Sequence, residues 1–355
     1  MPILIIFLGL LILVIVMADV LVTSLTAGGA GPLTGKLCRG AWKMGLRFNR
    51  KHSNHRFLTL LGWILLVGIA LLWLFLTWVG WTMVFCSFDE AVVNSTTKIP
   101  ATIGERIYFM GYTLSTLGLG DFQPATGIWQ FATAVASANG FFLVTLAIAY
   151  LLPVISAVVL KRQIALYITS LGGTPDEIIL RAWNGENFGQ FDQHLITLTA
   201  MMSQMAESYL AYPILNYFHS VERSKVFALS IVTLDDALTL LYYGVPEKNQ
   251  PDPAALRPAR RAVSGFLKTL KSAYIEPASE TPPLPPLEML AQEGIPTVSD
   301  EQFWHNTKHA TIRRQLLLAL VKHDGWTWDA VASMKTTNRG TWLDDESIID
   351  DAELH

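Results

Sequence analysis

The stretch "YTLSTLGLGDFQP", residues 112–124, carries the strongest chemical signal in the chain. Two glycines at alternate positions, Gly118 and Gly120, point to an unusual backbone path, because glycine adopts angles that other residues avoid. On such a path successive carbonyl groups can face one way and replace the hydration shell of a cation. The carbonyls concerned belong to Thr116, Leu117, Gly118 and Leu119, and Asp121 follows them.

The elements that must position this stretch are apolar. The 355 residues are 51% hydrophobic and only 15% charged, whereas soluble domains carry about 25% charge. Residues 2–25 hold one charge, Asp19, and residues 57–86 and 128–160 hold no Asp, Glu, Lys or Arg. Each run exceeds the roughly 20 residues that span a bilayer as helix. We expect three spanning helices; a cleaved signal peptide is the alternative for the first, but it lacks a basic start and an A-x-A-like site.

The distribution of basic residues predicts how the chain is oriented. No acidic residue occurs in 27–56, and Lys161 and Arg162 follow the third apolar run directly. The basic residues of 27–56 are Lys36, Arg39, Lys43, Arg47, Arg50, Lys51 and Arg56. The positive-inside rule then places a basic cytoplasmic loop at 27–56 and the whole C-terminal half in the cytoplasm. We expect a multi-pass protein of the cell membrane with residues 1–26 as its first helix and its N-terminus outside.

Residues 105–116 predict a short helix that cannot span the membrane. Irregular backbone such as the glycine-rich stretch is tolerated at membrane depth only inside protein or along a watery path. The partially negative C-terminal end of the short helix would face the same path.

Residues 57–160 resemble the pore module of potassium channels, with an outer helix at 57–86, a pore helix at 105–116, a filter at 116–121 and an inner helix at 128–160. The pattern T-x-x-T-x-G-x-G-D carries this resemblance. Its matching residues are Thr113, Thr116, Gly118, Gly120 and Asp121. The resemblance implies K⁺ bound at Thr116, Leu117, Gly118 and Leu119. It also implies an all-α membrane fold with a pore domain at 57–162.

One filter segment per chain implies a homotetramer, because a closed ring needs four. The commonest filter of the family has Tyr where this chain has Leu119, so apolar packing would replace a hydrogen-bonded collar; Tyr108 and Phe109 lie nearest that role. Because of this departure, a weakly selective cation channel remains an alternative to a K⁺-selective channel. A non-conducting receptor with a vestigial pore is the third alternative.

Filter support is expected from Thr113 and Tyr112. We expect the Tyr112 hydroxyl to donate to the Asp121 carboxylate; the alternative is that Tyr112 packs against the outer helix.

Gly140 and Pro153 are expected to form the gating hinge. Gly140 lies where the family commonly carries a hinge glycine, and Pro153 removes a helix hydrogen bond near the cytoplasmic end. The alternatives are a small residue at a helix interface and a proline that is merely tolerated. No helix carries regularly spaced Arg or Lys, so no voltage sensor is expected.

The C-terminal half predicts an α-helical cytoplasmic domain. Residues 163–245 form a helical region, 246–288 contain Pro-rich linkers and a helix, 289–343 are helical again and 344–355 form an acidic tail. Helices are expected at 194–217 with a break near Pro213, and at 224–243, 260–273 and 311–323. The run "PPLPP" is interpreted as a spacer more readily than as a binding motif.

Other classes of function find little support. No dinucleotide fingerprint, cyclic-nucleotide-binding pattern or nucleophile–base constellation occurs, so we expect no enzyme, no cofactor other than permeant K⁺, and no nucleic-acid partner. His305 and His309 are spaced for a metal but lack further ligands. Cys38 and Cys86 fall on opposite sides of the membrane and cannot pair. Expected partners are copies of the chain, lipid, and an unidentified cytoplasmic ligand or partner.

Overall fold

The structure, a computed structural model, describes residues 2–26, 30–52, 55–273 and 275–332. It confirms an all-α membrane fold in which two short strands are the only strands among the described residues. The chain divides into two units. The first contains Met1–Lys161, Ser203–Val221 and Lys268–Tyr274, and the second contains the remaining segments. The expected acidic tail, 344–355, lies outside the described residues.

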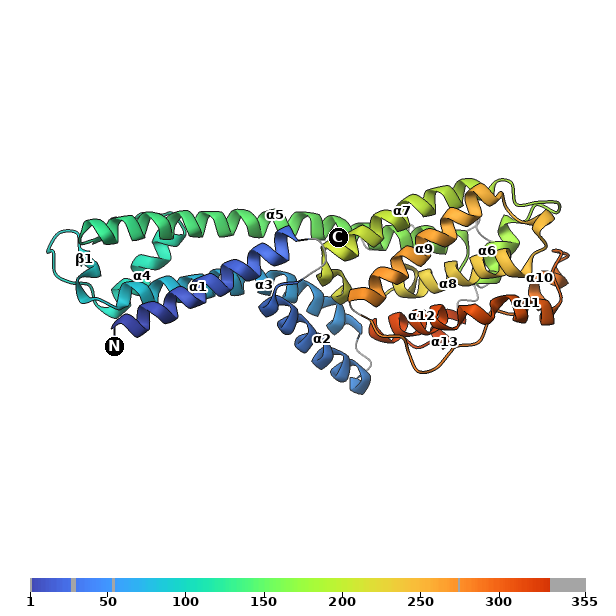
Figure 1. Ribbon diagram of the computed structural model, residues 1–355, viewed down its shortest axis with the longest axis horizontal. Helices are drawn as coiled ribbons and strands as arrows, with labels where there is room; N and C mark the ends of the chain where they lie inside the picture. The colour runs from blue at the N-terminus through green and yellow to red at the C-terminus, as the bar shows by residue number, and fades with distance from the viewer. Residues whose placement is uncertain (1, 27–29, 53–54, 274, 333–355) are drawn as a thin grey trace, which may run out of the picture. The chain divides into compact units, whose positions relative to one another are not determined.

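Three helices match the expected membrane spans: α1 (Pro2–Leu25), α3 (His55–Cys86) and α5 (Gly127–Leu171), of which α5 lies in the first unit up to Lys161. α1 lies along α3 (Figure 1). α5 continues eleven residues beyond the expected end at 160 (171 − 160), because Lys161 and Arg162 end the apolar run but are good helix formers. Pro153 lies inside this continuous helix.

The basic segment 27–56, expected to be a loop, contains the helix α2 (Pro32–His52). Its buried positions Cys38, Trp42, Gly45 and Asn49 recur at three- and four-residue intervals and so form one helix face. The loop prediction was wrong because basic residues between these positions obscure the helical period.

The outer segment between α3 and α5 is a short hairpin around a helix. It contains the turn η1 (Asp89–Ala91), β1 (Val92–Asn94), α4 (Ile103–Leu114) and β2 (Phe122–Pro124). β1 and β2 pair antiparallel, with Val93 opposite Gln123. α4 is the expected pore helix, shifted by two residues towards the N-terminus.

A returning segment completes the first unit. The end of α7 (Phe191–Ala211) leads into η2 (Pro213–Tyr217), where Pro213 breaks the helix as expected. The buried Lys161 donates from Nζ to the carbonyls of Leu215 at 3.2 Å and Phe218 at 2.7 Å.

The second unit packs around α8 (Phe227–Thr239), which continues as the π turn η4 (Leu240–Gly244). Length and composition would allow this stretch to cross a membrane, which adds a fourth such helix to the three that the sequence predicted. However, 89% of its most apolar window is buried by protein, so we assign it as a core helix. The elements around it in the chain are α6 (Pro175–Ala182), η3 (Arg223–Lys225), η5 (Glu247–Asn249), α9 (Pro253–Ala273), α10 (Glu288–Gln292), α11 (Asp300–Thr307), η6 (Lys308–Ala310), α12 (Thr311–His323) and α13 (Asp329–Ala332).

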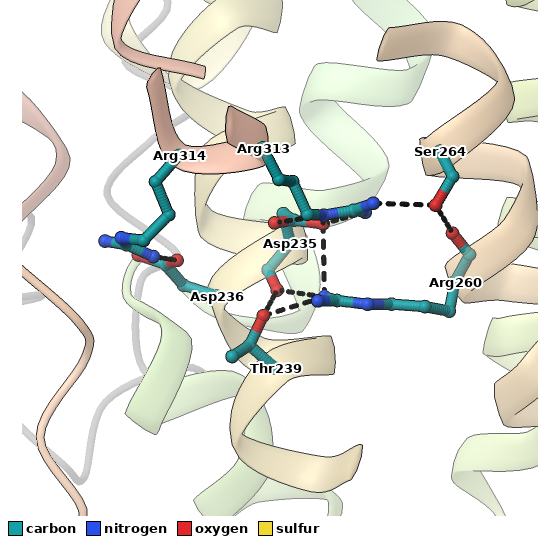
Figure 2. A network of polar contacts seen from close by, with 7 residues as sticks. All are labelled: Asp235, Asp236, Thr239, Arg260, Ser264, Arg313 and Arg314. Atoms are coloured by element: carbon teal, nitrogen blue, oxygen red, sulfur yellow. Dashed lines mark hydrogen bonds and ion pairs between the residues drawn. The ribbon is translucent and has the colours of Figure 1, made fainter. Parts of the chain in front are cut away.

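Two adjacent carboxylates of α8 are buried against arginines (Figure 2). Arg313 of α12 holds Asp235 with Nε at 2.8 and 2.9 Å from its two oxygens. Arg260 of α9 reaches the same carboxylate at 3.3 Å and the Thr239 hydroxyl at 2.7 Å. Burial alone raises the pKa of Asp235, but Arg260 and Arg313 outweigh it and hold the pKa of this carboxyl below its usual range.

Asp236 faces a single arginine. Arg314 Nη1 donates to its Oδ1 at 2.6 Å. Burial raises the pKa of Asp236 to about 6, because one ion pair offsets only part of the desolvation and Asp235 adds repulsion.

The proline-rich run 276–288 has no helix or strand before Glu288 begins α10, and it is anchored. Arg314 donates to the carbonyls of Pro282, at 3.0 Å, and Pro283. The run also borders a pocket of about 250 Å³ that Asp236 and Trp328 line. The segment is therefore not a spacer without contacts.

Candidate functional site: the glycine-rich filter

The pore helix α4 starts at a capping box that fixes its position. The Thr102 backbone N–H donates to Glu105 Oε2 at 2.7 Å, and Glu105 N–H donates to Thr102 Oγ1 at 3.4 Å. Trp78 of the outer helix α3 donates from Nε1 to the Ile107 carbonyl at 3.0 Å. These contacts, with buried Phe109 and Met110, set where the filter begins.

The filter backbone alternates in handedness. φ is +60° at Thr116, +57° at Gly118 and +85° at Gly120, while Leu117 and Leu119 do not have positive φ. In an extended chain successive carbonyls face opposite sides, and reversing the handedness of every second residue removes this alternation. The carbonyls of the filter can therefore face one side together, as the sequence predicted.

Thr116 adopts this conformation despite its β-branched side chain. A β-branched residue with positive φ is uncommon and strained, and strain of this kind clusters at functional sites. Two hydrogen bonds hold the entry to the filter: Thr116 N–H to the Thr113 carbonyl at 3.1 Å, and Leu117 N–H to the Tyr112 carbonyl at 2.9 Å.

Residues 115–121 are all exposed in the isolated chain. Leu117 and Leu119 expose 67% and 53% of their surface. Apolar side chains flanking a row of carbonyls need a covering surface that this chain does not supply among its described residues.

At the outer mouth, the end of the filter around Asp121, the structure differs from one expectation. The Tyr112 hydroxyl donates to the Phe122 carbonyl at 2.8 Å, not to Asp121. It is Tyr108, one helical turn earlier, whose hydroxyl lies 3.2 Å from Asp121 Oδ2. The prediction failed because the Phe122 carbonyl, at the start of β2, lies within hydrogen-bonding distance of the Tyr112 hydroxyl and accepts its hydrogen bond.

Backbone pairing also anchors the mouth. Ser95 N–H, just after β1, donates to the Asp121 carbonyl at 3.0 Å. Arg106, only 3% exposed, donates to the Asp89 carbonyl at 2.8 Å and ties α4 to η1. Sequence reasoning missed Arg106 and the strand pairing; a charged residue inside the apolar pore helix was the available signal for the former.

Gly140 of the inner helix lies against the end of the pore helix. A Cβ at this position would lie 2.2 Å from the Leu114 carbonyl oxygen, so only glycine permits this approach. Beside it, Trp81 Nε1 donates to Asn139 Oδ1 at 3.0 Å. Close packing thus gives Gly140 a role whether or not it is a hinge, and the hinge at Gly140 and Pro153 stays a prediction.

The structure also gives the positions of the remaining residues that the sequence singled out. Within the described ranges no group of three His, Cys, Asp or Glu side chains could hold a metal ion. Cys38 and Cys86 are both free thiols. Thr113 is buried behind the filter.

This arrangement defines the class: a short helix and a segment with alternating positive φ lie between two helices long enough to span a membrane. Residues 68–157 match a family model described as "Ion channel". The chain is also 35% identical over 321 residues to the "Uncharacterized membrane protein YdjJ" of Bacillus subtilis (strain 168), a match that covers 90% of this chain and 94% of that protein. No solved structure matches the chain.

The chain belongs to the P-loop ion-channel family with a two-helix pore module. It is a membrane protein, as its apolar helices require. The family consists of channels, not enzymes, and its members generally form oligomers in the membrane.

Proposed function

We propose that the protein is a K⁺-selective channel that conducts K⁺ passively through a homotetrameric pore and is gated by its cytoplasmic helical unit. The observation that carries this proposal is the alternating backbone handedness at Thr116, Gly118 and Gly120. Four such strands around an axis would present rings of carbonyl oxygens, which replace the hydration shell of K⁺.

The exposure of the filter supports the oligomer. Leu117 and Leu119 would be covered if neighbouring copies surrounded each filter strand. A receptor with a vestigial pore would have no need to keep a strained Thr116 between the buried Thr113 and two glycines.

The weakly selective channel is the second function. Leu119 favours it, because this side chain offers no hydrogen bond to hold the carbonyls in place. Reversal potentials in asymmetric K⁺ and Na⁺ separate the two: a value near the K⁺ equilibrium potential supports the first, and one near zero supports the second.

The direct test is ion flux from purified protein in liposomes. Gly118→Ala places a Cβ where φ is +57°, so K⁺ flux should fall at least tenfold with the oligomer intact. Gly104→Ala is the matched control, since this glycine has open space around it and no positive φ. K⁺ flux in Gly118→Ala equal to that of Gly104→Ala would contradict the carbonyl pore.

The length of α5 supports gating from the cytoplasmic unit. Its last ten residues, 162–171, belong to the second unit, so the helix that follows the filter continues into that unit without a break. Lys161→Met removes the hydrogen bonds to Leu215 and Phe218 and should change open probability without changing selectivity. Arg162→Met, at an exposed neighbouring position, should change neither. The stimulus is the unidentified cytoplasmic ligand or partner.

The orientation in the cell membrane follows from the basic residues of α2. Gly40 is exposed and has open space for a side chain. In a background without Cys38 and Cys86, Gly40→Cys should react with impermeant thiol reagents only from the cytoplasmic side. Labelling in intact cells would overturn the N-terminus-outside topology.

A further inference from the structure

Helix α2 has three distinct faces instead of the two of an ordinary amphipathic helix. The face on the protein contains Cys38, Trp42, Gly45 and Asn49, which are buried. The Trp42 ring lies 5.6 Å from that of Tyr217. This face accounts for how α2 packs on the first unit and leaves the other two faces to be explained.

The second face is apolar and exposed. Leu37, Met44 and Phe48 follow one another at seven- and four-residue intervals and so lie on one side of the helix. They expose 42%, 69% and 44% of their surface. Water is a poor environment for three large apolar side chains in a row.

The third face is basic and exposed. It carries Lys36, Arg39, Lys43 and Arg47 at three- and four-residue intervals. No acidic residue occurs in 27–56. Among the described residues no ion pair is formed by any of these four cations.

Helix α9 shows that a basic amphipathic helix does not have to expose large apolar side chains. Both helices have 21 residues. α9 also exposes four basic side chains: Arg257, Arg261, Lys268 and Lys271. None of its large apolar side chains is exposed, in contrast to α2. A helix that faces water resembles α9, and one that lies in a membrane interface combines exposed apolar and basic faces, as α2 does.

The attachment of α2 to the spanning helices fixes its depth. Asp19, in the last two turns of α1, is fully buried. It accepts hydrogen bonds from Leu33 N–H at 2.8 Å and Thr34 Oγ1 at 2.6 Å, in the first turn of α2. Trp73 of α3 donates to the same carboxyl at 2.9 Å. One side chain therefore joins α2 to two spanning helices at the end of α1.

We propose that α2 lies in the cytoplasmic leaflet interface and binds anionic phospholipid headgroups through Lys36, Arg39, Lys43 and Arg47. Leu37, Met44 and Phe48 enter the boundary between headgroups and acyl chains. The negative surface potential of that leaflet attracts basic residues close to the membrane. The proposal uses the orientation given above but does not depend on K⁺ conduction.

The test measures binding of fluorescent phosphatidylglycerol to the purified full-length protein in neutral detergent micelles, at low and high salt. Wild-type protein should bind phosphatidylglycerol at least tenfold more tightly than phosphatidylcholine, and the preference should shrink at high salt because the interaction is between charges. The variant K36Q/R39Q/K43Q/R47Q should lose this preference.

The matched control is R257Q/R261Q/K268Q/K271Q, which removes the same four charges from α9 and should keep the wild-type preference. A second variant, K36R/K43R, preserves charge and should also keep it, which separates lost charge from altered folding. Glycerol 3-phosphate should not compete, since it lacks acyl chains. Equal losses in the α2 and α9 variants, an undiminished preference in the α2 variant, or full competition by glycerol 3-phosphate would each overturn the proposal.

Discussion

The two units surround their buried carboxyl groups with different kinds of hydrogen-bond donor. Asp19, in the first unit, is held by neutral donors among the described residues: an indole N–H, a hydroxyl and the first backbone N–H groups of α2. Asp235, in the second unit, is just as buried but is held by the guanidinium groups of Arg260 and Arg313.

The difference follows from the surroundings of each unit. An arginine within a spanning helix costs about 2.5–3.5 kcal/mol to insert, whereas Trp73 and Thr34 bring donors without a further charge. The start of α2 adds the partial positive charge of a helix N-terminus. In the second unit, α9 carries an exposed basic face, so Arg260 reaches the core from a helix that already faces water.

The largest expected effect comes from removing a guanidinium beside a buried carboxylate. Arg313→Leu leaves Asp235 with Arg260 alone and should cost about 3–5 kcal/mol of folding free energy. The measurement is denaturant unfolding of the full chain in detergent. Arg261→Leu, on the exposed face of α9, should cost almost nothing.

The double variant Asp235→Asn/Arg313→Leu sharpens this result. It should be more stable than Arg313→Leu, because it no longer buries a charge with one partner missing. Equal stability of the double and single variants would mean that the ion pair contributes little.

The next effect is a pH dependence that distinguishes Asp236 from Asp235. The pKa of Asp236 is raised to about 6, so the folded protein binds this proton more tightly than the unfolded chain. The resulting stability is complete below the ordinary carboxyl pKa and is lost as pH rises through about 6.

Asp236→Asn should remove that decline, which amounts to at most about 3 kcal/mol between pH 4 and 7. Asp235 has the opposite sign: its pKa is lowered, so its contribution is lost as pH falls. Unfolding curves of wild type and Asp236→Asn with parallel pH profiles would show that Asp236 does not titrate in this range.

A smaller effect is expected at Asp19. Asp19→Asn weakens the hydrogen bonds to α2 and Trp73 and should cost about 2 kcal/mol. Cys38, one turn into α2, supplies a specific readout, because burial and then Asp19 raise the pKa of its thiol to about 12. In a Cys86→Ser background, Asp19→Asn should speed maleimide labelling of Cys38.

Ser24→Ala is the control for Asp19. Its hydroxyl bonds to the Val20 carbonyl of its own helix and to no residue of α2 that the structure describes, so Cys38 should stay protected. Unchanged labelling in Asp19→Asn would show that the buried face of α2 holds without the Asp19 contact.

The smallest effect concerns an exposed carboxylate. Tyr108→Phe removes the hydroxyl at 3.2 Å from Asp121 and should leave stability close to that of the wild type, since exposed charged contacts contribute little. Tyr112→Phe removes the hydrogen bond that the buried Tyr112 side chain donates to the Phe122 carbonyl. Its effect on channel inactivation should be larger than that of Tyr108→Phe. A larger effect at Tyr108 would reverse this ranking.

The sequence alone predicted the three spans, the short helix α4 and the alternating backbone of the glycine-rich stretch; its role as a K⁺ filter stays a prediction. Each of these features depends on residues that are close together in the chain. They are apolar runs longer than a bilayer needs, and glycines spaced so that the backbone can alternate in handedness. The break at Pro213 was equally local, because proline cannot continue the hydrogen bonding of a helix.

The tertiary structure decided which distant residues meet. Asp235 and Arg313 lie 78 positions apart, and Asp19 and Trp73 lie 54 apart, so no local pattern pairs them. The choice of Tyr108 over Tyr112 at Asp121 depended on how the chain turns into β2, and the run 276–288 gained its anchor from Arg314 on a later helix. Hydrophobic period and glycine spacing are set by neighbours in the chain, whereas the partner of a buried polar group is set by whichever donor the packed fold brings within hydrogen-bonding distance.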